Sequence, residues 1–411
     1  MPIAALSGWT SEQRHVVAAS FLGWTLDAFD FFLMVFVLAD IAKEFNTDIT
    51  EVTVAILLTL AMRPIGAFLF GRAADRFGRR PTLMVDVALY SVLEFASAFA
   101  PSLTALLILR ALYGVAMGGE WGVGASLTME SIPPHARGFV SGLLQSGYPT
   151  GYFLASLVYG LLFSYIGWRG MFMVGVIPAL LVLYIRRHVP ESPSWRPVTK
   201  RGSTLAVVRS HWQLGIYAVL LMTAFNFFSH GTQDLYPTFL QVQHGFRSHE
   251  VGLIAVIYNI GAIIGGISFG ALSERFGRRR MIIIAAVLSL FVLPLWAFAA
   301  TAVWLAVGAF LMQITVQGAW GVVPAHLNEL SPDEARGTFP GFVYQLGNLI
   351  ASVNATLQAA IAAHFGGNYA IALALVAGIV AVVIAILTAL GTEAKGVVFG
   401  KPATAALPAS A

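Results

Sequence analysis

The feature that most constrains this chain is a series of apolar windows, each long enough to cross a lipid bilayer. A helix needs about 20 mainly apolar residues to span the hydrocarbon core. Twelve windows qualify: 16–41, 52–74, 81–100, 103–129, 138–164, 168–188, 213–240, 250–273, 281–300, 302–327, 338–364 and 368–390. Only 11% of the residues are charged, against about 25% in a soluble domain. The sequence therefore predicts an all-α polytopic membrane protein with twelve transmembrane helices.

The distribution of Lys and Arg predicts the orientation of these helices. With the N-terminus inside, 19 of the 24 Lys and Arg residues fall in inside loops and termini, and only Lys43, Arg169 and Arg247 fall outside. Arg63 and Arg110 lie within predicted spans. Because cytoplasmic loops carry the excess of Lys and Arg, we expect both termini in the cytoplasm. The same rule explains the net charge of +4 without a nucleic-acid partner.

Two sequence blocks occur twice at one spacing. GRAADRFGRR begins at residue 71 and GALSERFGRR at residue 270, an offset of 270 − 71 = 199, and Glu130 and Arg137 match Glu329 and Arg336 at the same offset. This repeat predicts two pseudo-symmetric six-helix halves, 1–188 and 213–411. The polar stretch between them, 189–212, is expected to be a cytoplasmic linker that can carry a short amphipathic helix.

These repeated loops resemble the signature loop of the major facilitator superfamily, and LRALYGVAMGG in the fourth window resembles the fourth-helix motif of that superfamily. The resemblance covers nearly the whole chain and implies a transporter in which two halves rock about a central site. We expect the loop residues to hold the halves together in one conformation rather than to touch solute. These residues are Gly71, Asp75, Arg76, Arg79, Gly270, Glu274, Arg275 and Arg278.

The seventh window is unusually polar for a membrane span and reads NFFSHGTQDLYPT over 226–238. On one helix its polar residues share half of the circumference: Asn226, Ser229, His230, Gln233, Asp234 and Thr238. An intramembrane charge costs about 2.5–3.5 kcal/mol on insertion scales. This face must therefore line a wet cavity or pack against polar partners.

The same stretch resembles the signature N-x-x-[S/T]-H-x-[S/T]-Q-D-x-x-x-T of the fungal lactate permease family, which is grouped with bacterial sialate:proton symporters. The resemblance implies proton-coupled uptake of short monocarboxylates such as lactate and pyruvate. His230 and Asp234 are one turn apart, and a carboxylate beside a histidine tunes its protonation. We expect this pair to sense or carry the proton. The alternative is a structural polar cluster that joins the halves.

A carboxylate substrate also needs a cation. Arg63 is the better candidate, with pairing to Asp27 or Asp30 as its alternative role, whereas Arg110 lies near an outer helix end and can reach lipid headgroups or another helix. The remaining candidate substrate ligands are Asn226, His230, Gln233, Gln345, Asn348 and Tyr148, of which Gln345 and Asn348 match a Gln-x-x-Asn pair in the lactate-permease family. Gln145, Gln317 and Trp320 are further candidates for the cavity wall.

Three acids within predicted spans of the first half are candidates for proton coupling. Asp27 and Asp30 lie one turn apart and can either carry protons or neutralise Arg63. Glu120 sits between glycines in GGEWG, so that a role in proton coupling and a role in helix packing are both open. The candidate proton-coupling residues are therefore these three acids together with His230 and Asp234.

Other classes of protein are excluded by what the sequence lacks. There is no cysteine, so thiolate metal sites and disulfides are excluded, and we find no HExxH, GxSxG or phosphate-binding motif. We therefore expect no enzyme activity, no metal and no cofactor, with a proton gradient as the energy source. We expect a monomer in a bacterial inner membrane, with a small organic anion and protons as its ligands. Sialic acid, aromatic acids and dicarboxylates remain alternative substrates.

Overall fold

The computed structural model describes residues 8–195 and 209–399, and all regular structure within them is helical. The first group of helices comprises α2 (Ser11–Phe36), α3 (Leu38–Glu44), α4 (Ile49–Phe77), α5 (Arg79–Ser97), α6 (Leu103–Ser131), η1 (Pro134–Ala136), α7 (Arg137–Gln145), α8 (Gly147–Val174) and α9 (Ala179–His188). The second group comprises α11 (Trp212–Gln233), α12 (Tyr236–Val242), α13 (Ser248–Phe276), α14 (Arg278–Phe298), α15 (Ala302–Leu330), η2 (Asp333–Ala335), α16 (Phe339–Ala351), α17 (Asn354–His364) and α18 (Tyr369–Leu390).

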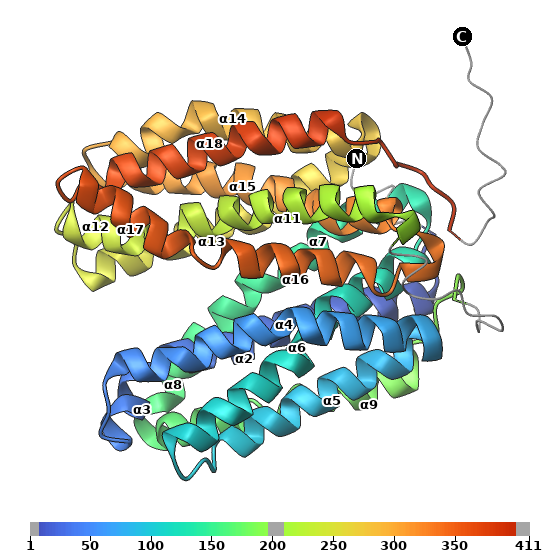
Figure 1. The fold of residues 1–411 in the computed structure, drawn as a ribbon, viewed down its shortest axis with the longest axis horizontal. Helices are drawn as coiled ribbons and strands as arrows, with labels where there is room; N and C mark the ends of the chain where they lie inside the picture. The colour runs from blue at the N-terminus through green and yellow to red at the C-terminus, as the bar shows by residue number, and fades with distance from the viewer. Residues whose placement is uncertain (1–7, 196–208, 400–411) are drawn as a thin grey trace.

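The helices form two bundles that lie side by side, α2–α9 in one and α11–α18 in the other (Figure 1). The bounds of α13 and α15 each follow those of α4 and α6 by 199 residues, as the sequence repeat predicts. Part of the linker predicted over 189–212, residues 196–208 with any amphipathic helix there, lies outside the described residues. The bundles diverge toward the end that carries α3 and α12 and come together at the other end, where Trp9 and Phe399 pack into one cluster (Figure 1).

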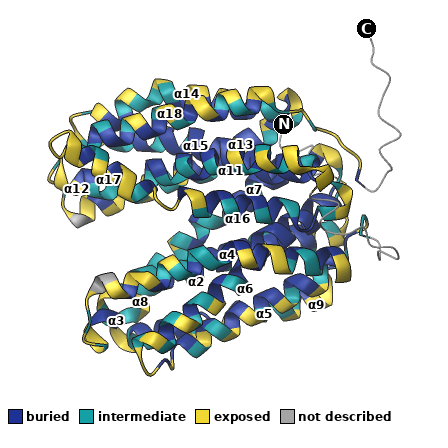
Figure 2. Ribbon diagram, in the orientation of Figure 1, coloured by how far each residue is buried: buried dark blue, intermediate teal, exposed yellow. Residues whose placement is uncertain are grey.

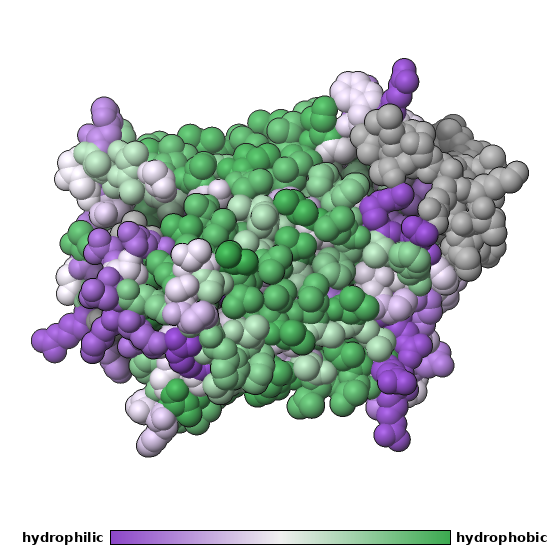
Figure 3. Space-filling model, turned by 60° about the horizontal axis from the view of Figure 1, so that its bottom comes forward, coloured by the Kyte–Doolittle hydropathy of each residue, from purple (hydrophilic) through white to green (hydrophobic). Residues whose placement is uncertain are grey.

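The outer surface is that of an integral membrane protein. A broad apolar face is bordered by hydrophilic residues at both ends (Figure 3), and exposed residues follow the outward faces of helices such as α14 and α18 (Figure 2). Large apolar side chains point outward there, for example Phe291 at 77% exposure and Ile379 at 61%. Ten helical segments of the described chain are long and apolar enough to cross a membrane.

All twelve predicted windows fall on helices, which confirms the all-α membrane fold. The count of twelve spans and the cytoplasmic termini stay predictions. The window at 81–100 coincides with α5, which carries Asp86 and Glu94 in its interior. The windows at 138–164 and 168–188 are separated by Gly167, whose φ of 61° is not helical and interrupts α8.

The seventh window departs from its prediction because its helix is interrupted. α11 ends at Gln233, the chain bends at Asp234 and Leu235, and α12 begins at Tyr236 with Pro237 in its first turn. A proline fits there because the first turn of a helix needs no amide donor. Thr238 therefore lies on a separate short helix, and the single polar face expected over 226–238 ends at Asp234.

The bundles meet through closely approaching backbones of α7 and α13. A Cβ atom on Gly142 would lie 2.2 Å from the carbonyl oxygen of Gly266, and one on Gly138 would lie 2.3 Å from that of Gly270. Only glycine permits such close contact between two helix backbones. We call these four residues the glycine seam.

Candidate functional site

A cavity of about 480 Å³ lies between the two bundles. Aromatic and polar side chains of both bundles line it. From the first bundle these are Trp24, Phe31, Phe32, Val35, Leu60, Arg63, Gln145, Tyr148, Pro149 and Tyr152, and from the second Ser229, His230, Gln233, Asp234, Pro237, Tyr258, Asn259, Ala262, Gln317, Trp320, Tyr344 and Asn348.

His230 and Asp234 form the predicted pair and both face the cavity. The histidine Nδ1 lies 3.2 Å from Asp234 Oδ1, and its Nε2 lies 3.0 Å from Asn348 Oδ1 of α16. The side chains retain 30% and 36% exposure, so the pair is open to solvent in the cavity. Because α11 ends directly after Gln233, the two residues lie at a helix end and not within an uninterrupted span.

Arg63 of α4 faces the same cavity from the opposite bundle. Its Nη2 atom lies 3.9 Å from Asp27 Oδ2, and its guanidinium carbon lies 5.4 Å from the centre of the Phe31 ring. The two roles weighed for Arg63, cavity cation and partner of an aspartate, are therefore compatible. The ion-pair partner is Asp27 and not Asp30.

Several other predicted residues join the cavity wall. Gln233 donates to Gln313 Oε1 at 2.8 Å, and Gln317 donates to Ser229 at 3.4 Å. Tyr148 packs on Trp24 with ring centres 5.5 Å apart. Further lining residues include Gln145 and Trp320, as expected, together with Trp24, Tyr152, Tyr258, Asn259 and Tyr344, which the sequence analysis missed.

Two predicted substrate ligands lie outside the wall of this cavity, and their role in binding stays a prediction. Asn226 is buried, and its amide donates to Met222 O at 2.8 Å and to Tyr344 O at 3.5 Å. It lies one turn before His230, where α11 packs closely on α16. Gln345 is only 1% exposed because it is turned by about 60° from Asn348 around α16, and only Asn348 reaches the cavity.

The interior of the first bundle contains further charges that do not line the cavity. Asp30 and Glu120 are fully buried without a hydrogen-bond partner in the described chain, and Glu120 lies against Gly23 of α2. Arg110 is also buried and donates to Glu94 of α5 at 2.6 Å. The expectation that Arg110 can reach lipid headgroups was therefore wrong, whereas its pairing with another helix is confirmed.

The sequence analysis missed two buried acids on α5. Asp86 has no partner in the described residues, and Glu94 pairs with Arg110. They lie eight residues apart and hence on similar faces of one predicted span. That spacing within an apolar window was the signal that could have identified them.

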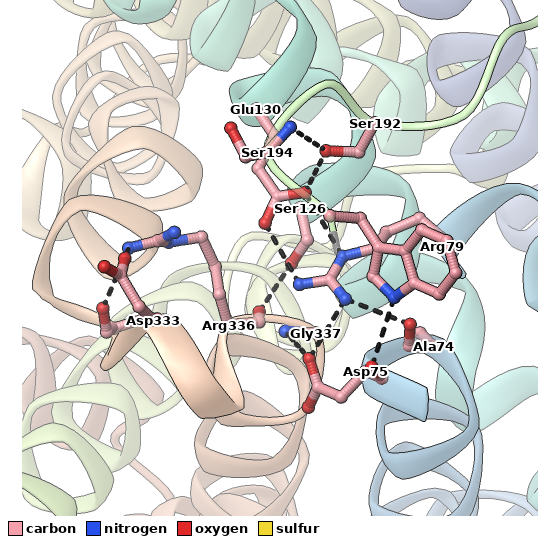
Figure 4. Close-up of polar contacts among 12 residues, drawn as sticks. Ala74, Asp75, Arg79, Ser126, Glu130, Ser192, Ser194, Asp333, Arg336 and Gly337 are labelled. Carbon is pink, nitrogen blue, oxygen red and sulfur yellow. Dashed lines mark hydrogen bonds and ion pairs between the residues drawn. The ribbon is translucent and has the colours of Figure 1, made fainter. Parts of the chain in front are cut away.

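A polar network closes the end of the molecule opposite the divergent ends (Figure 4). Asp75 accepts a hydrogen bond from the Gly337 amide at 2.8 Å and one from the Thr338 hydroxyl at 2.6 Å, so that α4 of the first bundle is joined to the second. Arg79 pairs with Asp75 at 3.2 Å and with Glu130 at 3.1 Å. We call Asp75, Arg79, Glu130, Gly337 and Thr338 the first latch.

The second latch repeats this arrangement from the other bundle. Glu274 accepts a hydrogen bond from the Gly138 amide and pairs with Arg278 at 2.7 Å, and Arg278 also pairs with Glu329 at 2.9 Å. These four residues form the second latch. The predicted contact of Asp75 with the adjoining half is therefore present, and Glu274 makes the equivalent contact in return.

The remaining predicted loop residues divide into two kinds. Gly71 and Gly270 lie at crossing points, where a Cβ would approach Thr338 Cα to 2.6 Å and Gly138 O to 2.5 Å respectively. Arg76 and Arg275 are exposed and lie over their neighbouring phenylalanines. These two arginines make no ion pair within the described residues and are not part of either latch.

Comparison with known families agrees with this architecture. The family model described as Major Facilitator Superfamily matches residues 20–247 and 219–407. The chain belongs to the Major Facilitator Superfamily. It is therefore an integral membrane transporter and not an enzyme, and the resemblance of its paired loops is confirmed at the level of the superfamily.

Three similar proteins share between 19% and 30% of the sequence. A carboxylic acid transporter protein homolog of Saccharomyces cerevisiae is 29% identical over 88% of this chain, which spans 63% of the yeast protein's length. The sialic acid transporter NanX of Escherichia coli is 30% identical over 82% of this chain and 84% of its own. The proton:xylose symporter XylE superposes with a TM-score of 0.78 at 19% identity, covering 95% of this chain and 98% of XylE, and shows that the fold is shared.

Proposed function

We propose that this superfamily member is a secondary active transporter that carries an organic carboxylate together with protons. One observation carries the proposal: Arg63 of the first bundle and the His230–Asp234 pair of the second line the same cavity. The arginine is a permanent cation that suits a carboxylate, and the histidine can change its charge near neutral pH. A central site that joins two halves is also where alternating access exposes a ligand to each side in turn.

The cavity supplies groups for both ligands. Arg63 can bind a carboxylate, while Asn348 and Gln233 offer amides for a hydroxyl or carbonyl oxygen. Binding of the anion beside His230 favours the protonated imidazole, and the protonated imidazole favours the anion. Cooperative binding of this kind couples the two ligands in one transport step.

Short monocarboxylates such as lactate and pyruvate are the first candidate substrates, because the motif at 226–238 resembles that of the lactate permease family. A larger acid with a ring is the second, and a specific observation favours it. The cavity of about 480 Å³ lies within the 300–1,000 Å³ range of pockets that hold drug-sized ligands. Its wall includes Phe32, Tyr148, Tyr258 and Trp320, and relatives are named for transport of sialic acid and 4-methylmuconolactone.

We further propose that the end bearing the latches is cytoplasmic, as the Lys and Arg distribution predicts. The diverging ends at α3 and α12 then face the outside, so that this conformation admits substrate from outside the cell. A monomer in a bacterial inner membrane is sufficient for transport by alternating access, and an inward proton gradient would drive uptake.

Uptake into proteoliposomes tests the proposal. We expect an imposed inward proton gradient to accelerate uptake of a labelled acid, and His230→Ala to abolish that acceleration. His249→Ala, a change at an exposed histidine of the same half, is the matched control and should behave as wild type. Gradient-independent uptake by the wild-type protein would disprove proton coupling.

A competition panel of lactate, pyruvate, acetate, sialic acid and benzoate separates the substrate classes. Strong competition by lactate and pyruvate supports the first candidate. Competition by benzoate or sialic acid, with none by lactate, supports the second. Failure of every acid to compete or bind would disprove a carboxylate substrate.

A further inference from the structure

The segment after α18 crosses from its own bundle to the junction between the two. We call residues 391–399 the tail segment. Glu393 holds its first part to the second bundle by accepting a hydrogen bond from the Arg279 amide at 3.0 Å. A turn follows at Gly396, whose positive φ of 85° suits glycine, and the chain then reaches Phe399.

Phe399 lies between two arginines from opposite bundles. The guanidinium carbon of Arg137 is 3.6 Å from the ring centre and that of Arg336 is 4.0 Å away. These two arginines occupy equivalent positions in the sequence repeat, since 336 − 137 = 199. One aromatic ring therefore contacts a cation from each half, an arrangement that desolvation strengthens.

Two further contacts hold the tail segment at this junction. Arg137 donates to the carbonyl oxygen of Val397 at 2.7 Å, which is a second link between the first bundle and the tail. Phe399 is only 8% exposed and packs in an apolar cluster contributed by both bundles. The other members are Val17, Met129, Ile132, Phe139, Val140 and Ala325, with Trp9, Leu143, Ile267 and Ala271 at the edge.

The equivalent segment of the first bundle behaves differently. After α9, Glu191 accepts hydrogen bonds from the Arg79 and Arg80 amides, much as Glu393 does in the second bundle. The aromatic residue that follows, Trp195, donates to Asp75 O at 3.1 Å and so contacts its own bundle. The crossing of the tail segment is thus not a consequence of the repeat.

We propose that the tail segment is an intramolecular clamp that stabilises the conformation closed at the latch end. Opening that end moves Arg137 away from Arg336 and Val397, so that Phe399 can no longer contact both guanidinium groups. The ring and the Val397 carbonyl therefore stabilise the closed junction and not the open one. The inference goes beyond the proposed function, because it holds for any substrate and any coupling ion.

Distance measurement between the diverging ends tests the clamp. The chain has no native cysteine, so spin labels can be placed at Lys43→Cys and Gln241→Cys, both exposed and on α3 and α12. Opening of the latch end brings these labels together. In the Phe399→Ala variant we expect double electron–electron resonance to show that the population with short label distances rises about tenfold relative to the population with long distances. This change corresponds to about 1.4 kcal/mol.

Matched variants separate the ring from other effects. Phe399→Trp keeps an aromatic face and should retain the wild-type distances, whereas Phe399→Leu keeps apolar volume without that face and should shift them toward short values. Val398→Ala, a change at a half-exposed neighbour, should have no effect. Unchanged distances in Phe399→Ala, or an equal shift in Val398→Ala, would overturn the proposal. Should Phe399→Ala fail to fold, the Leu and Trp variants decide, and unchanged distances in Phe399→Leu overturn it.

Discussion

Helices α4–α6 and α13–α15 have the same arrangement, yet five interior positions that carry charged residues in the first set carry apolar residues in the second. The first set buries Arg63, Asp86, Glu94, Arg110 and Glu120, and 199 residues later the second set has Ala262, Ala285, Leu293, Ala309 and Ala319. The latch residues, by contrast, occur in both bundles. Each bundle therefore needs latch charges to close against the other, whereas the fold does not need the interior charges.

From this difference we propose that the interior charges of the first bundle serve transport chemistry. Buried ion pairs are seldom more stabilising than apolar side chains of similar volume, and the second bundle shows that apolar residues fill these positions well. The first bundle then supplies charge, and the second supplies the titratable His230–Asp234 pair together with an otherwise neutral wall. Four predictions test this division.

The largest effect is expected where the buried pair of the first bundle is broken. Glu94→Ala leaves Arg110 buried without its partner, and we expect a loss of about 3–5 kcal/mol of stability, seen as a lower melting temperature. The double change Glu94→Leu with Arg110→Ala copies the second bundle and should recover most of that stability. A double variant as unstable as Glu94→Ala would show that the first bundle cannot accept the apolar interior.

A smaller effect is expected from removing the cation of the cavity. Arg63→Ala copies Ala262, and the loss of a charge-assisted hydrogen bond of about 1.5–3 kcal/mol should weaken binding of an acid substrate by at least tenfold. Isothermal titration or a binding assay on purified protein measures this. Arg72→Ala removes an arginine of the same helix outside the cavity and should bind normally, and equal affinities for both variants would contradict the role of Arg63.

The two latches should differ in strength. Asp75 accepts two hydrogen bonds across the junction and Glu274 accepts one. Asp75→Asn should therefore favour opening of the latch end more than Glu274→Gln does, by about 1 kcal/mol. The distance between spin labels at residues 43 and 241 is measured in both variants. A larger shift toward short distances in Glu274→Gln than in Asp75→Asn would contradict this prediction.

The smallest effect concerns one contact that is ionic in the first bundle and neutral in the second. Glu44 accepts a hydrogen bond from Arg169 at 2.7 Å, and 199 residues later Gln243 donates to Asn368 at 3.3 Å. Partial burial raises the pKa of Glu44, but hydrogen bonds from Arg169 and Trp168 lower it further, so the pKa lies below its usual value.

A carboxylate with a lowered pKa stabilises the folded protein above its unfolded-state pKa, and this contribution is lost as the pH falls through the folded-state value. Because the pair is well exposed, we expect at most about 1 kcal/mol. The melting temperature of the double variant Glu44→Gln with Arg169→Asn should therefore fall less than that of the wild type when the pH is lowered. An identical acid dependence for both proteins would show that Glu44 contributes nothing.

The sequence was informative where partners are close along the chain or repeated. The spacing of His230 and Asp234 predicted their contact, and the repeat predicted equivalent residues in both latches. The sequence was less informative where depth along a packed helix decides which side chains reach the cavity. Asn226 and Gln345 have the predicted chemistry, but both are buried outside the cavity wall. The contact of Phe399 with both bundles depends on how the folded halves meet, which no local pattern encodes.

The glycine seam bears on how fast such a protein can work. At Gly142 and Gly266 no side chain separates the backbones of α7 and α13. Because glycine has no side chain, parting the two backbones at this point requires no change of rotamer there. Two helices that touch through glycine backbones can separate and come together again without repacking side chains at that point. The glycine seam therefore favours rapid conformational change.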